Sequence, residues 1–172
     1  MTKALTIRPF TEADTPAIAA IYSHHVLTGT ATFEEVPPDT DEMLSRLSGL
    51  VDQGFPVLVA CTRADEVIGY AYAGPYKTRS AYRFTVEDSI YIHHEHLRKG
   101  AGQALLSTLI DHCRARDYKQ VLAVIGDSDN QGSIGLHQSC GFVSVGTARD
   151  LGFKFGRWLD VVYMQLSLQR KQ

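Results

Sequence analysis

The segment from residue 85 to residue 113 constrains the fold more strongly than any other part of the chain. It reads TVEDSIYI, then HHEHLRKGAG, then QALLSTLIDHC. The first part alternates like a strand, the second holds a glycine-bearing turn, and the third repeats apolar residues at helical spacing. A strand joined to a helix in this way buries its apolar residues within a layered α/β domain.

The flanking sequence supplies further strands and helices. A strand-like opening is followed by Thr11 and, three residues later, by Asp14, which is similar to the capping box that starts a helix. A second helix is expected from Asp39 to Gly54. The remaining elements are predicted as a hairpin over residues 56–63 and 67–76, a buried strand over 121–125, a short helix over 133–140, and strands over 143–148 and 158–168. This order predicts one α/β domain, residues 1–172, with a mixed sheet.

Composition and charge exclude several classes of partner. The chain has 17 Lys and Arg against 19 Asp and Glu, a formal net charge of -2, so it lacks the basic excess that holds nucleic acid or a membrane surface. Cys61, Cys113 and Cys140 are far apart and form no CxxC pair, which argues against a disulfide framework or a zinc cage. Neither a leader-like segment nor a long apolar run is visible, and we expect a cytoplasmic protein.

The turn LRKGAG has the composition of a phosphate-binding loop. Gly100 and Gly102 let the backbone approach a pyrophosphate closely, and the amides of the turn and the helix dipole attract its charge. Arg98 and Lys99 add local positive charge. An ordinary turn between a strand and a helix can also hold two glycines, so this motif alone does not decide the function.

Two other nucleotide-binding motifs fit less well. A dinucleotide-binding GxGxxG would need glycine or alanine where Leu105 stands, although Asp127 after the next strand keeps that interpretation open. The P-loop pattern GxxxxGK[ST] is absent from the sequence.

The histidines before the turn do not predict a metal site. His93, His94 and His96 are close in sequence, but a zinc-binding HExxH that begins at His94 would need histidine where Arg98 stands. We interpret these histidines as solvated loop residues and expect no metal.

The strand VEDSIYI, the turn LRKGAG and the later segment DNQGSIGLHQSCGF together resemble the GNAT superfamily of N-acetyltransferases. The resemblance implies a mixed, mostly antiparallel sheet flanked by helices, whose central parallel strands splay to admit acetyl-CoA as co-substrate. Leu97 departs from the pattern, because the family usually has Gln or Arg there, but contacts from backbone amides do not depend on that side chain. Asn130 and Ser133 match the family's NxxS, and Asn130 can also cap the helix that follows. The cofactor-binding residues that the resemblance implies are Ile90, Tyr91, Ile92, Leu97, Arg98, Lys99, Gly100, Ala101, Gly102, Gln103, Asn130 and Ser133.

A narrower resemblance runs from Ile7 to Leu168. The segments GPYKTRSAYRFTVEDSIY, LHQSCGF and GFKFGRWLDVVYMQL are similar to those of the phosphinothricin and methionine sulfoximine acetyltransferases. This implies a homodimer and a small amino-acid-like substrate with an anionic or strongly polar tetrahedral side chain. The implied substrate-binding residues are Phe33, Lys77, Arg79 and Tyr82. Core packing for Phe33 and a solvated basic loop for the other three are the alternatives.

The reaction that the resemblance implies needs a base, because an ammonium cannot attack a thioester. With an α-amino pKa of about 8, only about a tenth of the amine is neutral at pH 7. Glu87 is a carboxylate in an otherwise apolar strand, and it falls at the position of the family's glutamate. We interpret Glu87 as the general base, directly or through water. A structural ion pair with Lys or Arg is the alternative.

Two further groups are expected to assist. A strand amide near Tyr91 could stabilise the oxyanion if the splayed sheet leaves it free. His137 stands where many GNAT enzymes have a tyrosine and where the phosphinothricin group has histidine. It is interpreted as a proton donor to the leaving thiolate or as a substrate ligand, while a packed histidine is the plain alternative.

Two other functions remain open at this stage. The first is acetylation of a different amine, such as an ordinary amino acid, a polyamine or a protein N-terminus. The second is an acyl-CoA-binding sensor without catalysis, which the presence of Glu87 disfavours.

Overall fold

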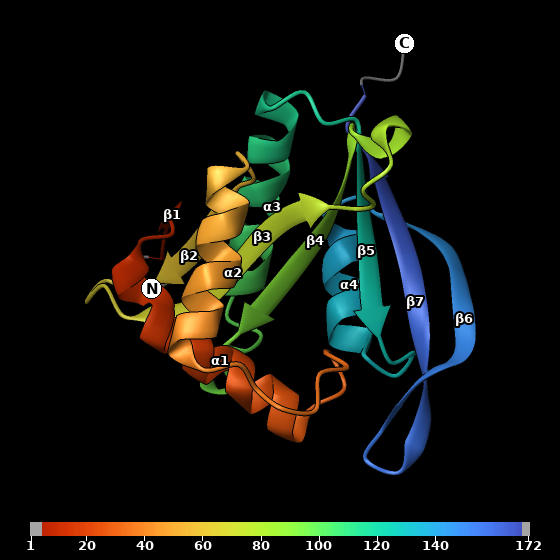
Figure 1. Cartoon of the computed structure of the whole chain (residues 1–172), viewed down its shortest axis with the longest axis horizontal. Coiled ribbons are helices and arrows are strands. Elements are labelled where there is room, and N and C mark those ends of the chain that lie inside the picture. The colour runs from red at the N-terminus through yellow and green to blue at the C-terminus, as the bar shows by residue number, and fades with distance from the viewer. Residues whose placement is uncertain (1–4, 170–172) are drawn as a thin grey trace.

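The computed structural model describes residues 5–169, and its sheet has seven strands in the order β1-β2-β3-β4-β5-β7-β6 (Figure 1). Residues 1–4, which open the N-terminal segment considered above, lie outside this range. Among the strands of the described residues, only β4 and β5 pair in parallel, so the mixed sheet predicted from the sequence is confirmed. The strands are β1 (Thr6–Pro9), β2 (Val57–Cys61), β3 (Val67–Pro75), β4 (Thr85–Ile92), β5 (Gln120–Gly126), β6 (Val143–Lys154) and β7 (Arg157–Ser167).

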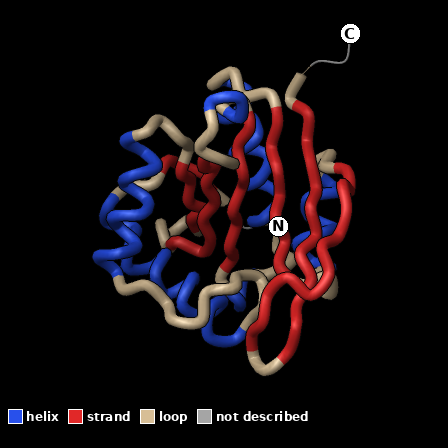
Figure 2. Tube along the Cα trace, turned by 45° about the vertical axis from the view of Figure 1, so that its right-hand side comes forward, coloured by secondary structure: helices blue, strands red, loops and turns tan. Residues whose placement is uncertain are grey.

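Helices cover both faces of the sheet (Figure 2). They are α1 (Thr15–Thr28), α2 (Thr40–Asp52), α3 (Ala101–Ala115) and α4 (Gln131–Ser139), with short 3₁₀ turns at Glu12–Asp14, Ser80–Tyr82 and His94–His96. On one face α1 and α2 pack against alternate residues of β2 and β3, such as Val59 and Tyr70. On the other face α3 packs against the intervening residues, such as Ala60 and Ala71. No helix within residues 5–169 is long and apolar enough to cross a membrane.

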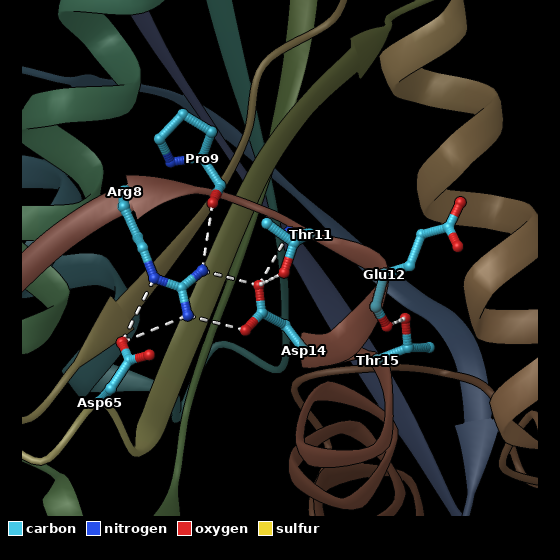
Figure 3. Close-up of polar contacts among 7 residues, drawn as sticks. All are labelled: Arg8, Pro9, Thr11, Glu12, Asp14, Thr15 and Asp65. Atoms are coloured by element: carbon cyan, nitrogen blue, oxygen red, sulfur yellow. Dashed lines mark hydrogen bonds and ion pairs between the residues drawn. The ribbon is translucent and has the colours of Figure 1, made fainter.

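Local sequence signals set the starts of the first two helices. Asp39 caps α2 by accepting a 2.8 Å hydrogen bond from the amide of Glu42, as the sequence predicts. The carboxylate of Asp14 accepts from the amide of Thr11, but α1 begins only at Thr15, after the 3₁₀ turn. Asp14 also accepts two 2.8 Å hydrogen bonds from Arg8 on β1 (Figure 3), which ties the first strand to the start of α1.

The parallel strands β4 and β5 are paired along only part of their length. The register joins Thr85–Asp88 to Gln120–Ala123, and both strands continue beyond these residues without pairing to each other. Figure 1 shows the two strands side by side at their start and diverging toward their ends. We call the point of separation, between Asp88 and Ala123, the fork.

The last hairpin is longer than the sequence analysis predicts. β6 runs to Lys154 rather than ending near Ala148, and a turn at Phe155 and Gly156 leads directly into β7. Both turn residues have positive φ, at 51° and 73°, as a tight hairpin turn requires. The pairing register shifts between Ser144 and Gly146 and again between Ala148 and Gly152, so the side-chain alternation that marks a strand is interrupted.

Candidate active site

A cleft of about 1160 Å³ opens where β4 and β5 separate. Its walls come from the ends of these strands, the turn before α3, the start of α3, and α4. Ten of the twelve predicted cofactor residues line it: Ile90, Tyr91, Ile92, Leu97, Arg98, Gly100, Gly102, Gln103, Asn130 and Ser133. Ala101 instead packs in the core, and the exposed Lys99 donates from its ammonium to the carbonyl oxygen of Glu95.

Glycine is required at the two positions of the turn for different structural reasons. Gly100 adopts φ +89° in open space, so it provides the left-handed backbone from which α3 starts. Gly102 lies within α3, where a Cβ would come within 3.2 Å of Leu136 on α4, so a small residue lets the two helices approach. The first amides of α3 have no partner within the helix, which makes its N-terminus suited to an anion.

Backbone groups of β4 alternate between its two neighbours. The amide of His93 donates to Ile68, and the amide of Tyr76 donates to Thr85, both in the same antiparallel register. By this alternation the Tyr91 amide faces β3, whereas the amides of Ile90 and Ile92 face the side where β5 has moved away. The donor expected near Tyr91 is therefore better supplied by one of its two neighbours.

Glu87 lies one residue before the fork. By strand alternation it shares a sheet face with Ser89 and Tyr91, on the side covered by α1 and α2. Burial, followed by the nearby charge of Asp88, raises the pKa of the Glu87 carboxyl above its usual value. No Lys or Arg within residues 5–169 forms an ion pair with it, which does not support the structural alternative. A carboxyl with a raised pKa is suited to accept a proton near neutral pH.

His137 on α4 is buried against the opposite side of the fork and lines the cleft. Its Nε2 lies 2.9 Å from Asp88 Oδ2, and its Nδ1 lies 2.7 Å from the carbonyl oxygen of Ser133. Asp88 is not among the site residues predicted from the sequence. The signal that could have found it is strand alternation, since the residue after Glu87 must face the other side of β4.

Asn130 caps α4 at the cleft wall. Its side-chain oxygen accepts a 3.2 Å hydrogen bond from the amide of Ser133. The helix-capping role expected from the sequence is therefore present, and Asn130 also lines the cleft, so the two expected roles are compatible.

The predicted substrate residues do not line the cleft and fall into two groups. Lys77, Arg79 and Tyr82 lie in the loop before β4, at the end opposite the glycine turn. The Lys77 ammonium lies 5.6 Å from the centre of the Tyr82 ring, and Arg79 is exposed. Phe33, in contrast, lies in the loop after α1, and its ring packs so closely against Gly126 and Gly152 that neither glycine has room for a Cβ.

Comparison with known proteins agrees with this geometry. Residues 18–142 match the acetyltransferase (GNAT) family. The chain is 53% identical over 165 residues to a phosphinothricin N-acetyltransferase of Alcaligenes faecalis, covering 96% of this chain and 83% of the relative. It is 41% identical over 163 residues to an L-methionine sulfoximine/L-methionine sulfone acetyltransferase of Pseudomonas paraeruginosa, covering 95% and 94%. The crystal structure of a GNAT-superfamily phosphinothricin acetyltransferase from Sinorhizobium meliloti in complex with acetyl-CoA superposes with a TM-score of 0.92 at 46% identity, covering 97% of this chain and 89% of the other. The fold, the fork and the turn, together with this similarity, show that the chain belongs to the GNAT family of acetyltransferases.

Proposed function

We propose that this protein transfers an acetyl group from acetyl-CoA to the α-amino group of a small amino acid of the phosphinothricin, methionine sulfoximine or methionine sulfone type. The observation that carries the proposal is the fork, which puts Glu87 on one face of the sheet and His137 on the other. The relatives named above act on substrates of this type, which supports the choice of substrate.

The cleft has the features that acetyl-CoA requires. The turn at Gly100 and the N-terminus of α3 offer amides for a pyrophosphate. The amides of Ile90 and Ile92, which β5 does not reach, are suited to an extended arm that carries amide groups. When bound, acetyl-CoA supplies a thioester whose carbonyl carbon accepts a nucleophile.

If the amine attacks the thioester directly, residues on the two sides of the fork have different roles in the reaction. Glu87 takes a proton from the substrate ammonium, which frees the nitrogen lone pair. An amide of β4 donates to the oxygen on which negative charge develops. His137 holds a proton on the cofactor side of the sheet, where the thiolate departs. No covalent enzyme intermediate is needed, and Cys140 has no assigned role.

The loop before β4 provides positive charge for an anionic substrate. Lys77 and Arg79 are exposed there and form no ion pair within residues 5–169, so both are free to bind a ligand. Arg79 can donate a forked pair of hydrogen bonds to a carboxylate or phosphinate, and Tyr82 adds one hydroxyl. Glu87 lies between this loop and the fork along β4.

A homodimer in the cytoplasm is part of the proposal. β6 is an edge strand, and its hairpin with β7 exposes large apolar side chains, including Phe153 and Trp158, which are 55% and 61% exposed. Gathered apolar residues of this kind are suited to a second copy of the chain. The three free thiols suit a reducing compartment. Sedimentation of the purified protein tests the oligomeric state.

Thiol release from acetyl-CoA tests the activity. The purified protein is offered phosphinothricin, methionine sulfoximine and methionine sulfone beside methionine, a polyamine and a short peptide with a free N-terminus. Faster turnover of the first three supports the proposal. Preference for the polyamine or the peptide would assign a different amine, and binding of acetyl-CoA without turnover of any amine would favour a sensor.

A further inference from the structure

Asp88 and His137 form a buried pair at the fork. Asp88 is the last β4 residue that pairs with β5, and the side chains of Asp88 and His137 are only 1% and 3% exposed. They come from positions 49 residues apart and meet at 2.9 Å between Oδ2 and Nε2. Both residues line the cleft.

The hydrogen-bond partners of the imidazole determine where its hydrogens lie. The Ser133 carbonyl oxygen only accepts, so His137 Nδ1 carries a hydrogen. Nε2 faces a carboxylate oxygen, so a second hydrogen lies between Nε2 and Asp88, on the nitrogen when Asp88 is ionised. The pair therefore holds one proton that can be given away while the Nδ1 hydrogen bond stays in place.

The surroundings of the pair favour the charged imidazole. Burial lowers the pKa of His137, but the hydrogen bond and charge of Asp88, together with the Ser133 carbonyl, outweigh it and raise this pKa above its ordinary value. Glu87, beside Asp88 on β4, is also titratable, and so is Cys113 on α3, where burial raises the pKa of the thiol to about 12 and keeps it neutral. The Phe142 ring meets the imidazole edge to face and gives it no proton partner.

We propose that Asp88 is a positioning residue that keeps His137 as an imidazolium at the fork, so that the proton shared between His137 Nε2 and Asp88 Oδ2 can pass to the departing thiolate. This inference rests on the proposed function. The second carboxylate oxygen, Oδ1, is buried without a hydrogen-bond partner within residues 5–169. It remains free to accept a hydrogen bond from a donor bound in the cleft.

The proton transfers of the reaction balance with the substrate, Glu87, the Asp88–His137 pair and solvent. The substrate ammonium loses one proton to Glu87 and, once the N–C bond has formed and the C–S bond has broken, a second proton also leaves the nitrogen. The sulfur gains one proton from the Asp88–His137 pair. Glu87 then gives its proton to solvent and the pair regains one proton from solvent. Because the second proton from the nitrogen also passes to solvent, the net release is one proton.

Asp88→Asn is the sharpest test, because asparagine keeps the shape and can still hydrogen-bond the imidazole but cannot hold its charge. In the free protein, ¹⁵N NMR of the imidazole is expected to show His137 doubly protonated at pH 7 in the wild type and neutral in the variant. Turnover should fall by up to about 10²-fold, the lower end of a general acid's contribution. The dissociation constant for acetyl-CoA should change less than about two-fold, and Asp111→Asn, at an exposed position on α3, should change none of these values.

Several outcomes would overturn the inference. A neutral His137 at pH 7 in the wild type would do so, as would an unchanged His137 titration in Asp88→Asn. If turnover and acetyl-CoA affinity fall together, Asp88 only shapes the cleft. Asp88→Ser provides the same readouts if the asparagine variant does not fold. The NMR titration needs no substrate, so it remains informative even if the protein acetylates none of the proposed amines.

Discussion

The ammonium of Lys154 donates a 2.8 Å hydrogen bond to the carbonyl oxygen of Thr32, which comes 122 residues earlier in the chain. It donates a second bond of 2.8 Å to the carbonyl oxygen of Gly29. Lys154 is only 1% exposed, and its burial lowers the pKa of the ammonium, which the charges of Glu35 and Glu34 partly offset. The β6–β7 hairpin thus holds the loop after α1, and with it Phe33, against the end of β5.

Lys154→Met tests whether this contact shapes the substrate site. Methionine keeps most of the stem but loses both charge-assisted hydrogen bonds, each of which typically contributes about 1.5–3 kcal/mol. We expect the KM for the amino acid to rise about ten-fold or more, because Phe33 loses its support. Acetyl-CoA affinity measured by calorimetry should fall less, since this loop forms only one part of the cleft wall. Lys119→Met, at a half-exposed position, is the matched control. Equal loss of affinity for both substrates would assign Lys154 to general stability instead.

Glu87→Gln tests the proposed base. Glutamine keeps the shape of the side chain but cannot accept the proton, so turnover at neutral pH should fall about 10²- to 10⁴-fold. Part of the rate should return at higher pH, where more of the free amine is neutral. A near wild-type rate at pH 7 would exclude Glu87 as the base.

The pH dependence of the wild-type enzyme follows from the raised pKa of Glu87. Because the pKa of Glu87 is raised, its carboxyl stays protonated, and cannot act as a base, at pH values where an ordinary glutamate is already ionised. We therefore expect kcat/KM to rise with pH at values above the ordinary pKa of a glutamate. The same shift contributes stability below the ordinary pKa, and this contribution is lost as pH rises through the folded-state value. Because Asp88 contributes to the shift, Asp88→Asn should move the acid limb of kcat/KM to lower pH. An acid limb that stays in place in this variant would show that another group controls it.

Gly102→Val tests the packing of the cofactor turn. The added Cβ would come within 3.2 Å of Leu136, and the larger side chain would also approach Ile92. The start of α3 must then shift, and acetyl-CoA affinity should fall by about ten-fold or more because its amides no longer face the cleft. Gly49→Ala in α2, where a Cβ meets nothing within 4 Å, is the control. Unchanged affinity in a folded Gly102→Val protein would show that the turn does not bind the cofactor.

Local signals predict most of the elements, whereas the features that the sequence does not predict depend on long-range contacts. Asp39 as the cap of α2 depends on neighbours within a few residues, so the sequence pattern predicts it. The full length of β6 depends on pairing with β7 across two register shifts, which interrupt the alternation that marks a strand. The residues of the candidate site divide in the same way between local and long-range signals. Glu87 is conspicuous in its own strand, whereas the role of Asp88 appears only when α4 brings His137 beside it.

Arg79→Leu tests the choice of an anionic substrate. Arg79 is exposed in the loop before β4, so the change removes a forked, charged donor without disturbing the core. A charge-assisted hydrogen bond contributes about 1.5–3 kcal/mol, which corresponds to roughly 10- to 150-fold in binding. We therefore expect phosphinothricin and methionine sulfone to lose much more kcat/KM than a neutral aliphatic amino acid, with acetyl-CoA affinity unchanged.

Arg83→Leu is the matched control for Arg79→Leu, because it removes the same charge from the same loop. Arg83 already has local partners, since it donates to the Ser80 carbonyl and lies 4.5 Å from the centre of the Phe84 ring. Its loss should weaken the binding of anionic substrates only slightly, and much less than Arg79→Leu does, through the general field of the loop. If Arg79→Leu behaves like this control, Arg79 does not bind the substrate's anionic group. If Arg83→Leu discriminates instead, the anion site lies one turn further along the loop.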